Sequence, residues 1–496
     1  MDRASKLRKL NNFRRALPHV SASALSAILG AEELPELKSR HDMRKATAAV
    51  MEGDTPYGPV LQRIPLVTKQ GEQTSMYIAH PLALLWSACH NCEPFAGFIR
   101  DAVIKRPSSH DEPWQLILYS DEVVPGNQLS HDNRRKAWVI HFSFLDLGAA
   151  ALSCEDMWFC VGAERSSFVK EISGGMGQVF KQVVKLFFGD VHDLATSGIV
   201  LNFAGGTLVR LFARVGMFLK DGGAHKAVWH CKGDGGTKLC MLCRNLYAEA
   251  SELVDEDGTD MLVCSIIHED ELDFATDADI RGSVRRLAEK WATSSTAERR
   301  DWTQAIGFRH EPDGMLMDPS LDTIVQPASQ FVHDWMHAFF VHGIFNTLSY
   351  WMMEAILQDG VRNIWELLHE YVSTYDWPRR INSTTLKDMF GKQRMVSSRK
   401  AAYLKCTASE GLSVYPVMCL FFLSVVMKAN RCINQVAAFV HMSGVIDLLQ
   451  AVPLNVVTPD ALRQQVSKFL TSCTAAGWRL FDGTVYAQYV NGVFMP

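Results

Sequence analysis

Several features that would place this chain in a simple class are missing from its sequence. The first twenty residues contain no apolar segment, so we expect no secretion signal. The most apolar run, Val414–Met427, is short for a membrane span and is interrupted by Pro416, so we interpret it as a buried helix and expect no membrane partner. No internal repeat and no low-complexity tract is present.

An excess of positive charge is also missing. The chain has 50 Lys and Arg against 54 Asp and Glu, a formal net charge of −4. Any nucleic-acid contact must therefore come from local basic patches and not from the overall field. The 12 cysteines are scattered over 496 residues, unlike a disulfide framework. A reducing compartment, the cytosol or the nucleus, is expected.

The length is sufficient for two or three domains. The N-terminal region, taken as residues 1–110, has a helical pattern, and an apolar helix is expected across Met76–Ile99 after a linker rich in Gly and Pro. Its basic start would contact phosphate or serve nuclear import, or form a solvated helix face. The basic residues there are Lys6, Arg8, Lys9, Arg14 and Arg15.

From Trp114 the pattern changes to that of an α/β domain. Buried strands are predicted at Trp114–Tyr119, Ala137–Phe144 and Met157–Gly162, followed by an amphipathic helix at Met176–Phe188 and a strand-rich run, Gly198–Leu219. Three strands, a helix and a further strand is the order of a ribonuclease-H-like mixed sheet flanked by helices. In that fold the first strand and the strand after the helix carry acids that meet side by side.

Acidic residues occur at the positions where a ribonuclease-H-like fold carries its metal-binding carboxylates. Asp121 follows the first predicted strand, Asp221 follows the last, and Glu410 begins an apolar helix. Neighbouring strands lie about 4.8 Å apart, so strand ends can hold two carboxylates at the spacing that a pair of Mg²⁺ or Mn²⁺ ions requires. For each acid taken singly, a surface carboxylate or a helix cap is the simpler interpretation, above all for Glu410.

The remaining domain boundaries follow from composition. Residues 111–245 are taken as the first part of the ribonuclease-H-like core, residues 246–395 as a large, mainly helical insertion, and residues 396–496 as the completion of the core with the Glu410 helix and an aromatic tail.

A glycine-rich turn after Asp221 contains Cys240 and Cys243, spaced as half of a zinc site. A downstream run, predicted to be helical, offers His333, His337 and His342, the first two spaced as neighbours on one helix face. The alternatives are a redox dithiol or two buried thiols for the cysteines, and hydrogen-bonded core side chains for the histidines.

The densest basic segment lies just before Glu410. It would bind DNA backbone phosphates, or else form a solvated linker. Its basic residues are Arg379, Arg380, Lys387, Lys392, Arg394, Arg399, Lys400 and Lys405.

Four segments together resemble a known family. They are L-Y-S-D-E-V-V-P-G-N-Q-L with the strand K-A-W-V-I-H-F, L-K-D-G-G-A-H-K with K-G-D-G-G-T-K-L-C-M-L-C, H-D-W-M-H-A-F-F-V-H-G-I-F, and T-A-S-E-G-L-S-V-Y-P-V. In this order they are similar to motifs of the DDE/D transposases of the CACTA, Plavaka and Kyakuja–Dileera–Zisupton type. The resemblance covers about residues 112 to 430, and Glu122 stands where many relatives have a lysine.

The resemblance implies Asp121, Asp221 and Glu410 as a catalytic triad that binds two Mg²⁺ or Mn²⁺ ions. It implies structural Zn²⁺ on Cys240, Cys243, His337 and His342, with Asp334 beside them. The expected activity is transposase-like cleavage and transfer of DNA strands in the nucleus. Transposon ends and target DNA would be the partners, and a homodimer the assembly. Two other hypotheses stay open: a domesticated, catalytically inactive descendant that binds DNA or protein, and a helical interaction protein without such a sheet.

Overall fold

The computed structural model describes residues 53–124, 135–189, 192–203, 208–254, 260–264, 271–379, 381, 383–454 and 456–478. The chain forms two compact units, Met1–Ser173 with Gln178–Gly216, and Gly174–Gly177 with Met217–Pro496. The expected helices before residue 53, with the basic residues Lys6 to Arg15, lie outside the described residues. Arg380 also lies outside them.

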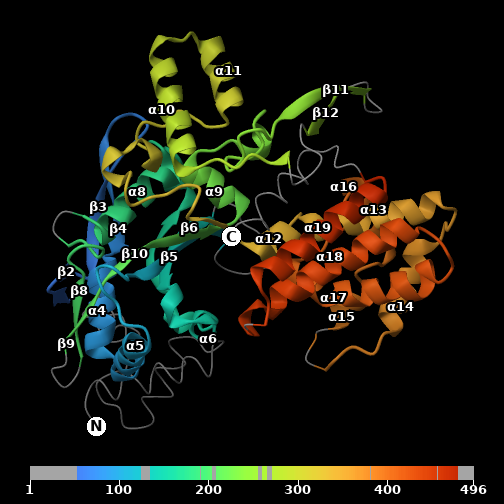
Figure 1. The fold of residues 1–496 in the computed structure, drawn as a ribbon, viewed down its shortest axis with the longest axis horizontal. Coiled ribbons are helices and arrows are strands. Elements are labelled where there is room, and N and C mark those ends of the chain that lie inside the picture. Colours follow the sequence, from blue (N-terminus) through green and yellow to red (C-terminus); the bar gives the residue numbers. More distant parts are fainter. Residues whose placement is uncertain are drawn as a thin grey trace. The chain divides into compact units, whose positions relative to one another are not determined.

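A five-stranded mixed sheet has the strand order β13-β10-β5-β6-β7. Figure 1 labels its three central strands, β10, β5 and β6. β5 pairs antiparallel with β6, β6 pairs antiparallel with β7, and β13 pairs parallel with β10. The strands are β5 (Trp114–Val123), β6 (Ala137–Phe144), β7 (Phe159–Arg165), β10 (Ala213–Lys220) and β13 (Phe331–His333). This mixed sheet, flanked by helices, confirms the predicted α/β class.

The first predicted strand is longer than its apolar pattern indicates. Trp114, Leu116 and Leu118 are fully buried, as expected for a central strand. Pairing with β6 continues to Val123, with Asp121 opposite Val139. Asp121 therefore lies near the end of β5, as predicted, and the strand continues past the apolar run because backbone pairing does not require apolar side chains.

The segment before this sheet is partly extended. β3 (Leu61–Val67) and β4 (Gln73–Ala79) form an antiparallel hairpin. Ile64 and Leu66, like Met76 and Ile78, are buried at every second position, which is the period of a strand. The predicted helix from Met76 is therefore wrong as far as Ala79. The other elements here are β1 (Asp54–Thr55), β2 (Gly58–Pro59), α4 (Pro81–Asn91) and α5 (Glu93–Lys105).

The predicted amphipathic helix is confirmed as α8 (Gly175–Phe187). Its apolar residues are buried, and the ring of Phe187 lies edge-on to Phe142 of β6 at 5.1 Å between centroids. The strand-rich run that follows consists of β8 (Ile199–Asn202), β9 (Leu208–Leu211) and β10.

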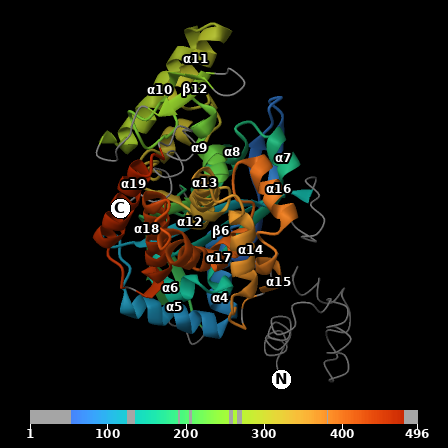
Figure 2. The ribbon, with the colours of Figure 1, turned by 90° about the vertical axis from the view of Figure 1, so that its right-hand side faces the viewer.

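The segment predicted as a helical insertion, residues 246–395, is more varied than expected. It holds a β-hairpin and a pair of capped helices that run side by side (Figures 1 and 2), and then β13, which belongs to the sheet. Three residues of strand are too few for a recognisable apolar period. The elements before β13 are β11 (Ala248–Val254), β12 (Asp260–Cys264), α10 (Asp277–Thr293) and α11 (Thr296–Ile306).

After β13 the chain forms a helical bundle around one hydrophobic core. Its helices are α12 (Trp335–Phe340), α13 (Ile344–Gln358), α14 (Ile364–Thr374), α15 (Ser383–Lys387), α16 (Lys392–Ala401), α17 (Ala408–Phe421), α18 (Ile433–Ala451) and α19 (Pro459–Ala475). The predicted buried helix corresponds to α17 with the π-helical turn Phe422–Met427.

Two segments of this bundle, Ala408–Met427 and Ile433–Leu454, are long and apolar enough to cross a membrane by length and composition. Core helices of water-soluble proteins pass the same test, and side chains such as Met418, Phe422 and Phe439 contribute to the core of the bundle.

Candidate functional site

Asp121 is half-buried on β5, two residues before the strand ends. The hydroxyl of Tyr119, on the same face of the strand, donates to Asp121 Oδ2 at 3.3 Å. The neighbouring acid, Glu122, instead pairs with Lys136 Nζ at 2.9 Å. Burial raises the pKa of Glu122, but hydrogen bonds from Ser166 and Lys136 hold that pKa below its ordinary value. The two adjacent acids therefore occupy different surroundings.

Asp221 is the residue between β10 and α9 (Gly222–Trp229). Its backbone is extended, and Oδ1 accepts the N–H of Ala224 at 2.5 Å, so Asp221 is the N-cap of α9. The acid therefore has a structural task at the end of the strand. Because β10 and β5 are neighbours in the sheet, Asp121 and Asp221 belong to adjacent strands.

Glu410 lies in the first turn of α17, as predicted, and is strongly engaged. Arg394 donates to its Oε1 at 2.9 Å and to its Oε2 at 2.8 Å. Oε2 also accepts the N–H of Thr407, which completes a capping box. Burial alone would raise the pKa of Glu410, but these bonds and the charge of Arg394 lower it. Glu410 therefore acts as a helix cap in this structure.

Beside Asp221 lie buried groups that the sequence did not single out. Lys220 is fully buried, and burial lowers its pKa well below the ordinary value, while Asp221 opposes that shift. His225 Nδ1 accepts from Trp229 Nε1, and Nε2 lies 3.0 Å from the carbonyl of Val332. These two bonds select the neutral tautomer with the proton on Nε2, and the bond to Val332 ties α9 to β13. The sequence feature that could have indicated these buried groups is the presence of Lys220 and His225 among apolar residues.

Cys240 and Cys243 are both buried, and their thiols are within hydrogen-bonding reach of each other. Burial alone would raise the pKa of Cys240. The thiol of Cys243 and the backbone N–H groups of Leu242 and Cys243 lower that pKa below its ordinary value. Cys231, which the sequence analysis did not select, is close enough to interact electrostatically with Cys240. Burial raises the pKa of Cys231 to about 12. This environment suits a thiolate ligand and equally suits a redox dithiol.

The three histidines do not share one helix. His333 ends β13, Asp334 is the N-cap of α12, and His342 follows the helix with a left-handed backbone, φ 55°. The expectation that His333 and His337 pair on one helix face is therefore wrong. The reason is that Asp334 caps the helix and separates them.

Each histidine has its own neighbours. His333 meets the ring of His225 edge-on, and His342 meets Tyr403 edge-on. His337 Nδ1 lies 2.8 Å from Asp334 Oδ2. Burial raises the pKa of Asp334, but hydrogen bonding to His337 lowers it. A carboxylate on one ring nitrogen is the usual support for a histidine that binds metal through the other.

Within the described parts of the chain, no three Cys, His, Asp or Glu side chains form a group that could hold a metal ion. The triad and the zinc set both stay predictions. The chain matches no protein-family model and no curated protein sequence.

The predicted DNA-binding residues are mostly exposed, and two of them have internal contacts. Arg394 is half-buried against Glu410, and the guanidinium of Arg399 lies 5.9 Å from the centre of the Trp365 ring. The exposed members, apart from Arg399, are Arg379, Lys387, Lys392, Lys400 and Lys405.

Proposed function

We propose that this chain is a transposase-like protein that cleaves and transfers DNA strands, with Asp121, Asp221 and Glu410 as its acidic triad. The observation that carries the proposal is the strand order. β5, which bears Asp121, neighbours β10, which leads directly into Asp221. The same order, with β5, β6 and β7 antiparallel in succession and β13 parallel to β10, agrees with a ribonuclease-H-like sheet.

The carboxylates fit hard divalent cations only in part. Asp121 and Asp221 carry oxygen donors of the kind that Mg²⁺ and Mn²⁺ prefer, and both are half-buried. Glu410 does not fit in this arrangement, because Arg394 and Thr407 take its oxygens. Two such ions, when bound, supply Lewis acidity to the attacking and leaving oxygens of a phosphodiester.

The chain's own residues would orient the acids and the DNA. Tyr119 positions the carboxylate of Asp121 through its hydroxyl, and the Ala224 N–H positions that of Asp221. The exposed cations of α16, Lys392, Arg399 and Lys400, would bind backbone phosphates. The proposed ligands of structural zinc are Cys240, Cys243, His337 and His342, with Asp334 orienting His337. These described side chains do not form one group in this structure, so zinc would have to draw the two pairs together. Transposon ends and target DNA are the proposed partners, in the nucleus and as a homodimer.

The test is Mn²⁺-dependent nicking of a DNA duplex by the full chain. We expect Asp121→Asn and Asp221→Asn each to remove nicking, because a neutral amide oxygen binds a divalent ion much more weakly than a carboxylate does. Glu122→Gln is the matched control, since Glu122 is adjacent but pairs with Lys136, and it should retain nicking. Equal nicking by all four proteins would overturn the proposal.

One observation favours a second candidate, a catalytically inactive descendant that binds DNA or protein. The two-pronged ion pair between Arg394 and Glu410 is what a purely structural glutamate would show. In that case the wild-type chain should bind DNA or a partner protein without Mn²⁺-dependent nicking, and Asp221→Asn should change neither affinity.

A further inference from the structure

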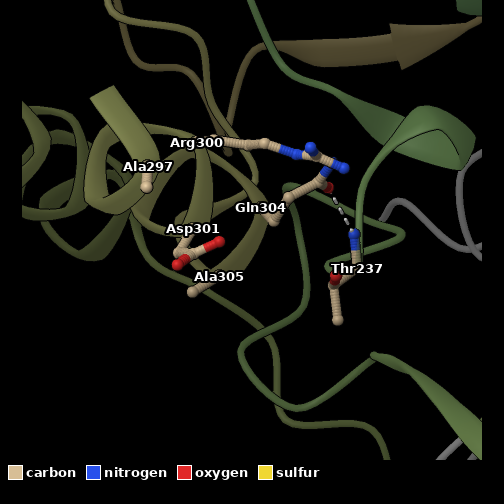
Figure 3. Close-up of a pocket in the computed structure, with 6 residues that line it drawn as sticks. All are labelled: Thr237, Ala297, Arg300, Asp301, Gln304 and Ala305. Atoms are coloured by element: carbon tan, nitrogen blue, oxygen red, sulfur yellow. Dashed lines mark hydrogen bonds between the residues drawn. The ribbon is translucent and has the colours of Figure 1, made fainter. Parts of the chain in front are cut away.

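A hollow of about 590 Å³ lies between α11 and the turn that precedes Cys240. Its lining residues are Thr237, Ala297, Arg300, Asp301, Gln304 and Ala305 (Figure 3). Gln304 Oε1 accepts the backbone N–H of Thr237 at 3.1 Å, which ties the turn to the helix. Arg300 extends across the hollow toward this bond, whereas the acid, Asp301, lies beside Ala305 (Figure 3).

Two more cations come from backbone segments joined next to the end of α11. The Lys232 N–H donates to the Gly307 carbonyl and the Arg309 N–H donates to the His230 carbonyl, both at 2.8 Å. Gly236 packs closely against the side chain of Lys232, since a Cβ added to Gly236 would lie 2.8 Å from Lys232 Cβ. Lys232 therefore lies next to the turn that contains Thr237. Lys232 and Arg309 are therefore brought to the same region as Arg300.

The two arginines act on Lys232. Burial lowers the pKa of Lys232, and the positive charges of Arg309 and Arg300 lower it further. Arg300 and Arg309 are exposed. Among the residues that the structure describes, no ion pair with a carboxylate is found for any of the three. Arg300 is the cation of the lining and Asp301 its acid, while Lys232 and Arg309 lie on the segments joined beside the end of α11.

We infer that this hollow binds a phosphate group, with Arg300 as the charged contact and with Lys232 and Arg309 contributing to the field. The guanidinium of Arg300, with its forked donors, suits the several oxygens of one phosphate, and the two neighbouring cations would strengthen the attraction. The phosphate could come from a nucleic-acid backbone or from a small free anion. The nucleic-acid source rests on the proposed function and would make this a contact separate from the basic segment before Glu410. The free-anion source does not depend on it.

The experiment measures binding of a short labelled DNA duplex by fluorescence anisotropy at several salt concentrations, in EDTA so that no strand is cut. We expect the Arg300→Gln, Lys232→Gln double variant to bind about tenfold more weakly. The slope of log affinity against log salt should fall by about 1 to 2. Arg286→Gln is the control, because Arg286 is an exposed arginine on the neighbouring helix α10. Thermal melting checks that all variants are folded.

A second arm measures binding of pyrophosphate by calorimetry with the same proteins. If pyrophosphate binding is lost in the double variant while DNA binding is unchanged, the hollow takes a small phosphate compound. If the double variant matches Arg286→Gln with both ligands, the inference is overturned. It is overturned as well if the wild-type chain binds neither. None of these outcomes involves strand cleavage, so the inference and the proposed activity fail separately.

Discussion

Arg394 and Glu410 form a two-pronged ion pair across the start of α17, with both carboxylate oxygens of the glutamate within 2.9 Å of the guanidinium. The same carboxylate closes a capping box with Thr407. If Glu410 is to bind a metal ion, Arg394 has to move away, and a DNA phosphate is the kind of group that would attract it. In this structure the carboxylate of Glu410 is therefore fully engaged by Arg394 and Thr407.

The first prediction concerns the stability that this pair supplies. Glu410→Ala should lower the free energy of unfolding by about 1–3 kcal/mol, because it removes the cap and leaves a half-buried arginine without its carboxylate. Urea denaturation measures the change. Glu410→Gln, which still offers an oxygen to the Thr407 N–H, should lose less. An unchanged midpoint for Glu410→Ala would show that the pair is absent in solution.

The second prediction separates the two tasks of Asp221. Since Oδ1 caps α9, Asp221→Ala should cost about 1 kcal/mol of stability, and Asp221→Asn should cost much less because asparagine is an equally good N-cap. Both variants should lose the proposed nicking. If Asp221→Asn is as unstable as Asp221→Ala, the negative charge and not the cap is what stabilises the helix.

The sequence predicted the central elements because their burial leaves a clear pattern. β5 and β6 are apolar runs, and α8 buries one face at helical spacing, so their type and order were readable. β13 was missed because three residues carry no period, and its place beside β10 is decided by pairing with a distant segment. The hairpin β3–β4 alternates between buried and exposed residues, but Met76 and Ile78 were joined to the apolar run that follows.

For the candidate site, the sequence could predict which residues belong to it but not which partners they contact. Asp221 was placed correctly at the end of a strand and Glu410 in the first turn of a helix. The partners that engage them, Ala224 and Arg394, follow from the folded chain. Cys231 lies near Cys240, and its backbone pairs with Phe308; local spacing in the sequence indicates neither contact. Sequence patterns report which groups are present, whereas the opposing charges and hydrogen bonds depend on long-range packing.

The third prediction concerns the cysteine turn. If the proposed zinc site exists, purified protein should contain about one zinc per chain, and a chelator should lower its melting temperature. Cys240→Ser and Cys243→Ser should each lose the metal. Cys473→Ser is the control, because Cys473 is a buried thiol in α19 with no role in the proposed site. Metal-free protein in which a mild oxidant links Cys240 to Cys243 would favour the redox dithiol instead.

The fourth prediction is a pH dependence that arises at His80, the N-cap of α4. His80 Nδ1 accepts the Ala83 N–H, so the ring must be neutral at that nitrogen. Burial, together with the nearby His192, lowers the pKa of His80 from 6.5 to about 4. Because the folded pKa lies below the unfolded one, the unfolded chain binds the proton more tightly. Stability should therefore fall as the pH is lowered from about 6.5 to about 4.

A pKa difference of this size corresponds to roughly 2–3 kcal/mol at pH 4. Urea denaturation at several pH values measures it. His80→Asn keeps an oxygen for the Ala83 N–H and does not titrate, so its unfolding free energy should fall less steeply over the same range. Part of the slope should remain, because His230 is also buried and has its pKa lowered to about 4. Identical slopes for the wild type and His80→Asn would mean that the pKa of His80 does not differ between the folded and the unfolded chain.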